Sequence, residues 1–335
     1  QPLKLLEKTG LEVVQGPTWD ITGPTSSVDL RTLADVFYAS GLHDLDRLGC
    51  QVGAWLDLVR SLAPDLIIGE YSPGLAAAVR GARPYLTIGS GFTVLPPVQP
   101  APPFRFWEKG TSLQSIEHER ILMMSFNAVR RSIGLSPMGS LSELFDGNFV
   151  GVCTYPALDN YRAYRKRPAL GPLFPRLSKA LPVARERRGV FAYLSGLATD
   201  FDTIAAGLAS ASVPVAAHVR DLLPGQQQML RACGVDFHAE PQDLWAKLPG
   251  YAAIVHHGGL STTHVAIETA TPQLILPNST EQVITGQTVV DLKLGLGLAR
   301  RQRSESSVAA ALQTLVGSPA YCERAQALRD AARRR

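Results

Sequence analysis

The chain has 335 residues, of which 45% are hydrophobic and 19% charged, and its formal net charge is +4. This length and composition favour a globular protein with two domains. Because the sequence contains no run of eighteen apolar residues and nothing near Gln1 resembles a signal peptide, we expect a cytoplasmic protein without integral membrane association.

Cysteine spacing and arginine clusters exclude further classes. The cysteines lie far apart and form no C-x-x-C pair, which argues against a disulfide framework and a zinc cluster. Basic clusters lacking interleaved aromatic residues occur beside predicted loops or at the terminus, at residues 165–167, 185–188, 300–303 and 333–335. We interpret these clusters as solvated surface and expect no nucleic-acid partner.

The first half of the chain alternates helical patterns and short buried strands. After a turn at Gly10 we predict a strand, then helices over 27–40 and 48–62, a strand over 65–70, a helix over 74–82 and a strand over 84–91. A proline-rich loop at 95–103, an amphipathic helix over 112–135 and a strand over 149–156 follow. The opening residues read as the second half of a helix, so we expect the first strand and its loop to be missing before Gln1.

The second half begins with a predicted domain linker within 171–189, where proline and charge occur without periodicity. Strands are predicted over 189–195, 213–219, 235–239, 252–257 and 273–277, with helical patterns between them. Continuously apolar strands separated by helices indicate parallel sheets covered on both faces. The predicted fold class is therefore α/β, with two doubly wound domains.

A polar loop follows one of these strands in the stretch VHHGGLSTTHVAIETATPQLILPNSTEQ, residues 255–282. His256 and His257 end the strand, a glycine pair forms the turn, and Ser261 or Thr262 is expected to cap the next helix. Glycines admit a bulky anion, and a helix N-terminus offers unsatisfied N–H groups. We therefore predict a phosphate site here, with His256 donating a hydrogen bond to a phosphate oxygen.

The neighbouring strand, 273–277, ends beside Glu281 and Gln282. Parallel strands open their carboxyl ends on the same edge of a sheet, which is where doubly wound proteins bind ligands. A carboxylate and an amide together suit vicinal sugar hydroxyls. Phosphate and sugar together predict a nucleotide-sugar.

This stretch resembles the donor-binding signature of the family-one glycosyltransferases with the GT-B fold, especially bacterial natural-product enzymes, whose pattern runs roughly H-H-G-G-x-G-T-T, G-x-P-Q and D-Q. Residues 189–196, GVFAYLSG, are similar to the first strand of the family's C-terminal domain and its phosphate-side turn. Residues 239–248, AEPQDLWAKL, resemble the segment that borders the nucleobase. The first half of the chain matches only in element order and in PDLIIGE.

The resemblance implies two Rossmann-like domains facing a central cleft: an acceptor domain over 1–175 and a donor domain over 176–335, whose last helix can cross back to the first. It assigns donor binding to Ser195, Gly196, His238, Gln242, His256, Gly258, Gly259, Ser261, Thr262, Thr263, Glu281 and Gln282. It places the acceptor near Phe92, the proline loop and the helix that contains Met123.

Several positions depart from the family's pattern. Ser261 replaces a glycine, Glu281 replaces an aspartate, and the turn at 270–272 reads Ala-Thr-Pro. The aromatic that stacks on uracil in plant relatives corresponds to Ala239, so His238 or backbone groups must hold the base. Uridine and thymidine both stay open.

The implied reaction is inverting transfer of a hexose from a nucleoside-diphosphate sugar to a hydroxyl of a small apolar acceptor, without a metal or cofactor. The acceptor's proton needs a base. In the family this is commonly a histidine in the loop after the first strand, which we expect to lie before Gln1. Among the residues present, Glu70 is the best substitute because it ends the predicted strand over 65–70 at the carboxyl edge that faces the expected cleft.

The sequence also allows two other interpretations. A zinc site at His256, His257 and His264 lacks the H-E-x-x-H spacing, and His264 is expected to line the polar face of its helix or to approach the ribose. The alternative from another class is a noncatalytic GT-B homologue that binds a nucleotide or serves as a helper protein. The missing histidine, Ala239 and Ala270 motivate it.

Overall fold

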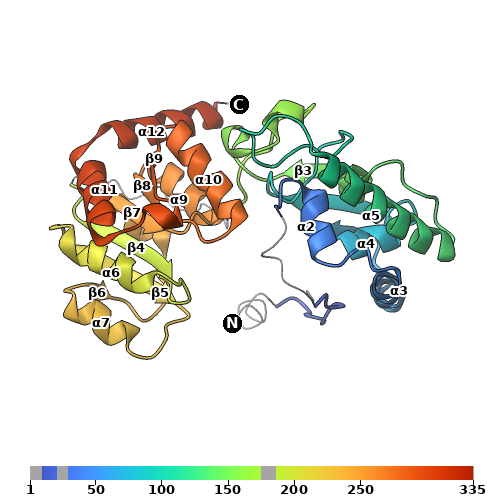
Figure 1. Ribbon diagram of the computed structural model, residues 1–335, viewed down its shortest axis with the longest axis horizontal. Coiled ribbons are helices and arrows are strands. Elements are labelled where there is room, and N and C mark those ends of the chain that lie inside the picture. Colours follow the sequence, from blue (N-terminus) through green and yellow to red (C-terminus); the bar gives the residue numbers. More distant parts are fainter. Residues whose placement is uncertain (1–9, 21–28, 175–185, 335) are drawn as a thin grey trace. The chain divides into compact units, whose positions relative to one another are not determined.

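The computed structural model describes residues 10–20, 29–174 and 186–334, which form two compact units (Figure 1). Unit 1 runs to Val152 and resumes over 160–168, whereas unit 2 contains 153–159 and everything from Ala169. The chain therefore divides between 168 and 169 rather than after 175. The predicted linker at 171–189 lies partly outside the described residues.

Both described ends of that linker are hydrogen-bonded within unit 2. The N–H of Gly171 donates to the carbonyl of Thr154, and the N–H of Arg188 donates to the carbonyl of Gly250. Because of these backbone hydrogen bonds, Gly171 and Arg188 are part of unit 2 and do not belong to a free linker.

Unit 1 is built on a three-stranded parallel sheet in the order β1-β2-β3. Its strands are β1 (Ile67–Gly69), β2 (Tyr85–Gly89) and β3 (Phe149–Val152), and its helices are α2 (Leu33–Ala39), α3 (Leu45–Leu62), α4 (Pro73–Val79) and α5 (Leu113–Ser132), with short 3₁₀ turns η2 (Leu141–Phe145) and η4 (Arg162–Tyr164). α2 begins later than the pattern predicted because Thr32 caps it through a capping box with Asp35.

The strand expected after Gly10 is wrong. Residues 11–20 form no strand, and Leu11, Val13 and Val14 are exposed. Apolar residues without a neighbouring ladder lack the hydrogen bonds that define a strand.

Unit 2 is built on a six-stranded parallel sheet in the order β6-β5-β4-β7-β8-β9. Its strands are β4 (Val190–Ser195), β5 (Val215–Arg220), β6 (Asp236–Phe237), β7 (Ala253–His256), β8 (Gln273–Ile275) and β9 (Gly295–Gly297). Its helices are α6 (Phe201–Ser210), α7 (Gln226–Ala232), α8 (Leu244–Lys247), α9 (Leu260–Glu268), α10 (Thr280–Asp291), α11 (Glu305–Gly317) and α12 (Ala320–Arg333), with 3₁₀ turns η3 (Pro156–Leu158), η5 (Leu248–Gly250) and η6 (Arg300–Gln302). β9 was missed, since its glycines read as the end of a helix.

Strand alternation gives this sheet two buried faces. Val190, Ala192 and Leu194 pack with residues of α6 and α11, whereas Phe191 packs on the opposite face with Ile254 and residues of α9. Helices covering both faces explain why the strands are apolar throughout.

The last helix, α12, belongs to unit 2, where Arg329 donates a hydrogen bond to the carbonyl of Glu268 at the end of α9. The expectation that it crosses back to the first domain stays a prediction. Its exposed face is charged, and its inner residue Ala325 is fully buried against α9 and α10.

Within the described part of the chain, none of the helices combines the length and the apolar character needed to span a membrane.

Candidate functional site

The carboxyl edge of the unit 2 sheet brings together the loops after β4, β7 and β8. His257 links them: its Nδ1 lies 2.8 Å from the carbonyl of Leu276, and its Nε2 accepts from the N–H of Ser195 at 3.0 Å. A carbonyl only accepts and an amide only donates, so this imidazole is neutral with its proton on Nδ1. Burial lowers the pKa of His257, which favours the same neutral form.

His256 is buried at the carboxyl end of β7. It is 1% exposed, its Nε2 pairs with Oε1 of Gln273 at 3.0 Å, and its Nδ1 accepts from the N–H of Gly258. Burial lowers its pKa to about 4. Both ring nitrogens of His256 are thus engaged inside unit 2, which does not favour the predicted phosphate contact, and that contact stays a prediction.

The turn after β7 requires its first glycine. Gly258 has a φ of +92°, and a Cβ there would lie 2.9 Å from Cγ2 of Ile275 and 3.0 Å from the carbonyl of Gln282. Gly259 has an ordinary φ and open space around its Cβ position. The loop after β7 is thereby pressed against the start of α10.

Gly259, and not Ser261 or Thr262, caps α9. The helix therefore begins at Leu260, and the amides of its first turn have no acceptor within the helix. Ser261 is exposed and Thr262 half-buried, whereas the hydroxyl of Thr263 donates to the carbonyl of Gly259. Unsatisfied amides and two accessible hydroxyls together form a site for an oxyanion.

The phosphate-side turn after β4 is held in place by α7. The N–H of Gly196 donates to the carbonyl of Arg220, and Nε2 of Gln226 donates to the carbonyl of Gly196. A Cβ at residue 196 would lie 2.3 Å from Oε1 of Gln226. Ser195, half-buried, accepts through Oγ from the N–H of Leu197.

The carboxylate and amide expected to bind the sugar lie in the first turn of α10, which Ser279 caps. Glu281 and Gln282 are both half-buried. Gln282 folds back, since its Oε1 accepts from the N–H of Asn278 at 2.7 Å. Its side-chain NH₂ remains as a donor at the loop.

The residues expected at the nucleobase follow β6, at the far end of the same edge. The carbonyl of His238 accepts from Nδ1 of His218, while its own Nε2 is buried without a hydrogen-bond partner among the described residues. Gln242 is half-buried and donates to the carbonyl of Glu240. Nε2 of His238 lies 3.6 Å from Oδ2 of Asp236, which is beyond hydrogen-bond distance, so this nitrogen can still bond a ligand.

His264 lies inside unit 2 rather than on the helix's polar face. Its Nε2 is 2.9 Å from Oγ1 of Thr154, its ring meets Tyr155 edge-on, and burial lowers its pKa to about 4. The expected ribose contact is therefore wrong. Within the described ranges, no cluster of histidine, cysteine and acidic side chains could hold a metal ion.

In unit 1, Glu70 directly follows β1 and is exposed. Its carbonyl accepts from the hydroxyl of Ser72, while its carboxylate has no hydrogen-bond or ion-pair partner in the part of the chain that the structure describes. A free carboxylate at the carboxyl end of a strand can accept a proton.

The two residues expected at the acceptor lie apart in unit 1. Phe92 packs on Phe104 with ring centroids 5.3 Å apart. Met123 lines a groove of about 940 Å³ on α5, together with Pro100, Ile116 and Met124. Phe92 is not among the residues that line it.

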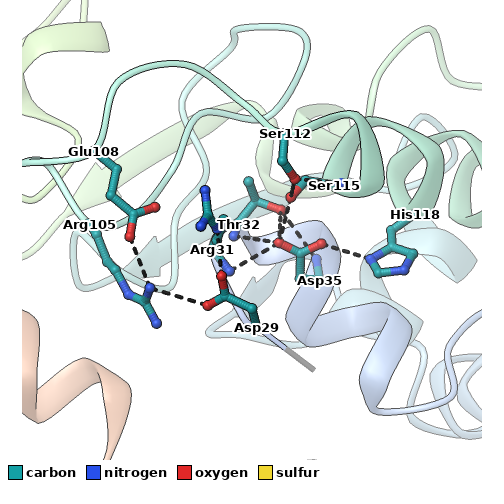
Figure 2. Close-up of polar contacts among 9 residues, drawn as sticks. All are labelled: Asp29, Arg31, Thr32, Asp35, Arg105, Glu108, Ser112, Ser115 and His118. Atoms are coloured by element: carbon teal, nitrogen blue, oxygen red, sulfur yellow. Dashed lines mark hydrogen bonds and ion pairs between the residues drawn. The ribbon is translucent and has the colours of Figure 1, made fainter. Parts of the chain in front are cut away.

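Sequence reasoning missed a buried histidine–aspartate pair between α2 and α5 (Figure 2). Nδ1 of His118 lies 2.7 Å from Oδ1 of Asp35, whose Oδ2 accepts from the hydroxyl of Ser115 and the N–H of Thr32. The ring of Tyr38 stacks on the ring of His118, with the centroids 4.0 Å apart. The aspartate fixes the ring and leaves Nε2 as the remaining basic nitrogen, a pairing that sequence separation concealed.

A second missed group is Arg303 at the carboxyl edge of unit 2. Its side chain is fully buried and pairs with Asp200 at 2.8 Å. The prediction that the cluster at 300–303 is solvated is therefore wrong for its last member.

Comparison with known proteins places these features in context. Residues 241–334 match the family model described as the C-terminal domain of erythromycin biosynthesis protein CIII-like proteins. The erythronolide mycarosyltransferase of Saccharopolyspora erythraea is 34% identical over 85 residues, which cover 25% of this chain and 20% of the relative. The vancomycin aglycone glucosyltransferase of Amycolatopsis orientalis is 38% identical over 63 residues, covering 19% and 16%. These matches thus span about a fifth of the length of the curated relatives.

Solved structures resemble the whole chain in fold. The glycosyltransferase VinC, in complex with dTDP, has a TM-score of 0.63 at 17% identity, covering 98% of this chain and 84% of VinC. The spinosyn forosaminyltransferase SpnP has a TM-score of 0.64 at 17% identity, covering 99% and 84%. The predicted α/β fold class is thus confirmed: the chain has the GT-B fold of these solved glycosyltransferases, and residues 241–334 match the EryCIII-like C-terminal domain.

Proposed function

We propose that this chain binds a nucleoside-diphosphate sugar at the carboxyl edge of the unit 2 sheet and transfers its hexose, with inversion, to a hydroxyl of a small apolar acceptor. The observation that carries the proposal is the start of α9. Its first amides are free of helical acceptors, Gly259 leaves open space before them, and Ser261 and Thr262 add hydroxyls.

The chemistry follows from this placement. The diphosphate is the leaving group, and the partial positive charge at the start of α9 stabilises the negative charge that it gains in the transition state. The proposal needs no metal ion or cofactor because these amides supply the stabilisation. The complex of VinC with dTDP supports a thymidine donor, with uridine as the second choice.

The acceptor's proton is assigned to Glu70, whose carboxylate is exposed and follows β1. His118 is the competing base, since Asp35 orients its ring. Met123 and the groove on α5 are assigned to the acceptor, since Pro100, Ile116 and Met124 offer apolar contacts beside the polar side chains of that groove.

A binding measurement tests the donor site directly. The protein is titrated by calorimetry with UDP, dTDP and their glucose conjugates, alongside Gly259→Asp. An aspartate here is a favourable helix cap and has room, so folding is retained, but its charge occupies the anion site. We expect micromolar binding by the wild type and at least tenfold weaker binding by the variant.

Gly250→Asp is the matched control, because residue 250 also has open space around its Cβ but lies before β7, at the other end of the strand. Equal affinity of wild type and Gly259→Asp would reject the site. Failure of the wild type to bind any nucleotide would favour the noncatalytic helper.

A further inference from the structure

Arg303 is a buried cation at the carboxyl edge of unit 2, just before Ser304 caps α11. Its Nε donates to the carbonyl of Leu298 at 3.0 Å, and its Nη2 donates to the carbonyl of Pro277. Its Nη1 donates to Oδ2 of Asp200 at 2.8 Å and to Oδ1 of Asn278 at 3.1 Å. The planar fork of an arginine suits this set of acceptors, which a solvated side chain would not make.

These partners come from separate loops. Asp200 caps α6 at the end of the loop after β4, Asn278 lies in the loop after β8, and Leu298 follows β9. His257 links the first two loops independently, through Ser195 and Leu276. Two side chains thereby fix the loops that the proposed function places around the diphosphate.

Charge gives Arg303 a second role. The side chain of Asp200 is 16% exposed, and its Oδ1 is buried without a hydrogen-bond partner among the described residues. A carboxylate in this position repels a diphosphate, and the repulsion is strong where water is excluded. Pairing with Arg303 cancels that charge at the donor edge.

The charges of Arg303 and Asp200 both act on the imidazole of His257. Arg303 lowers its pKa and Asp200 raises it, while burial lowers it most. The same imidazole touches the turn after β4, so Asp200 and Arg303 act at the phosphate side of the edge.

Building on the proposed function, we infer that Arg303 is a positioning residue of the donor site: it neutralises Asp200 and holds the loops after β4 and β8 for a nucleoside diphosphate. Arg303 does not itself have to touch the ligand. Its effect depends on the ligand's charge, which separates it from a residue that only maintains the fold.

The test compares Arg303→Ala, Arg303→Lys and Asp200→Asn by calorimetry, with dTDP and dTMP or UDP and UMP as ligands. We expect Arg303→Ala to weaken diphosphate binding about tenfold or more, and monophosphate binding less. Arg303→Lys keeps the charge and is expected to restore most of the affinity. Asp200→Asn breaks the same ion pair but removes the negative charge, so its diphosphate affinity is expected to stay equal or increase.

Arg187→Ala is the matched control. Arg187 also bridges a loop of unit 2, donating to the carbonyl of Thr269 and to Oγ1 of Thr271, but this loop enters β8 at the opposite edge. It is expected to lower the melting temperature without changing the ratio of diphosphate to monophosphate affinity.

The direction in which Asp200→Asn changes diphosphate affinity tests the role of Arg303 even if Arg303→Ala does not fold. Weaker diphosphate binding by Asp200→Asn overturns it, as does unchanged binding by Arg303→Ala when the wild type binds. Absence of nucleotide binding by the wild type overturns the proposed function and this inference together.

Discussion

The two units place polar chemistry in different ways. In unit 2, the loops after β4, β7 and β8 meet at one edge, and buried side chains such as His257 and Arg303 hold them there. In unit 1, Glu70 is exposed after β1, while the His118–Asp35 pair is buried between helices. The position of a binding edge is set by the order of parallel strands, because their loops end at one edge. The position of a proton-transfer group depends instead on contacts between side chains that are distant in the sequence.

The largest expected effect tests the proton-transfer group assigned in unit 1. Glu70→Gln keeps the shape of the side chain but removes its basicity, so we expect turnover to fall by about two orders of magnitude or more with nucleotide affinity unchanged. Steady-state kinetics with a glycosyl acceptor, together with calorimetry, measures both. Asp65→Asn, exposed before the same strand, is the control and should retain activity.

Unchanged turnover in Glu70→Gln would remove Glu70 from the mechanism. A comparable loss in His118→Gln, with normal folding and donor binding, would then assign the base to the His118–Asp35 pair.

Acid should destabilise unit 2 through its buried histidines. The folded-state pKa of His264 is lowered to about 4 by burial, whereas an unfolded histidine titrates near about 6.5. Stability is therefore complete above that higher value and declines as pH falls toward about 4, with a loss of about 2 kcal/mol from this residue at about pH 5.

Urea denaturation at neutral and acid pH measures the effect, comparing wild type with His264→Gln, whose amide can still bond Thr154. The variant should lose less stability on acidification. An identical pH dependence in the two proteins would contradict the assignment.

Alanine variants of the adjacent histidines His256 and His257 should differ in nucleotide affinity. His257→Ala removes the link between Ser195 and Leu276, so we expect about tenfold weaker nucleotide binding along with a destabilisation of about 1–3 kcal/mol. His256→Ala leaves Gln273 without its buried partner, with similar destabilisation but near-normal affinity. Calorimetry and urea denaturation of both variants separate the two; equal affinity losses would erase the distinction.

The smallest expected effect concerns the acceptor. Met123→Ala enlarges the groove on α5 and should raise the acceptor KM a few-fold without changing the melting temperature, since the side chain is only partly buried. Leu113→Ala, exposed on the same helix and outside the groove, is the control. A loss confined to Phe92→Ala would move the acceptor site to the loop after β2.

Much of unit 2 could be predicted because apolar strands and glycine turns are local patterns. Periodicity located β4 through β8, and the glycine pair located the turn at Gly258 with its positive φ. Periodicity could not decide which of His256 and His257 faces the edge, since a shift of one residue moves every side chain to the opposite face of the sheet. β9 was hidden because its glycines carry no strand propensity.

The remaining site residues escaped because their meaning depends on distant partners. Arg303 looked like a member of a solvated cluster, and only the fold places it against Asp200, far away in the sequence. His118 looked like an ordinary residue of an amphipathic helix, and only α2 supplies Asp35. Pairing across long sequence separations has no local pattern from which to predict it.

The assignment of residues 153–159 to unit 2 limits how this protein can recombine with its relatives. A transplanted donor half that starts at Ala169 would leave behind Thr154 and Tyr155, which bond His264 and Glu268 inside unit 2. The buried imidazole of His264 would then lack its partner, and Glu268 would keep only Arg333, which is costly in any new host. A cut before Cys153 keeps these partners together, although it also carries residues 160–168 of unit 1 into the new host.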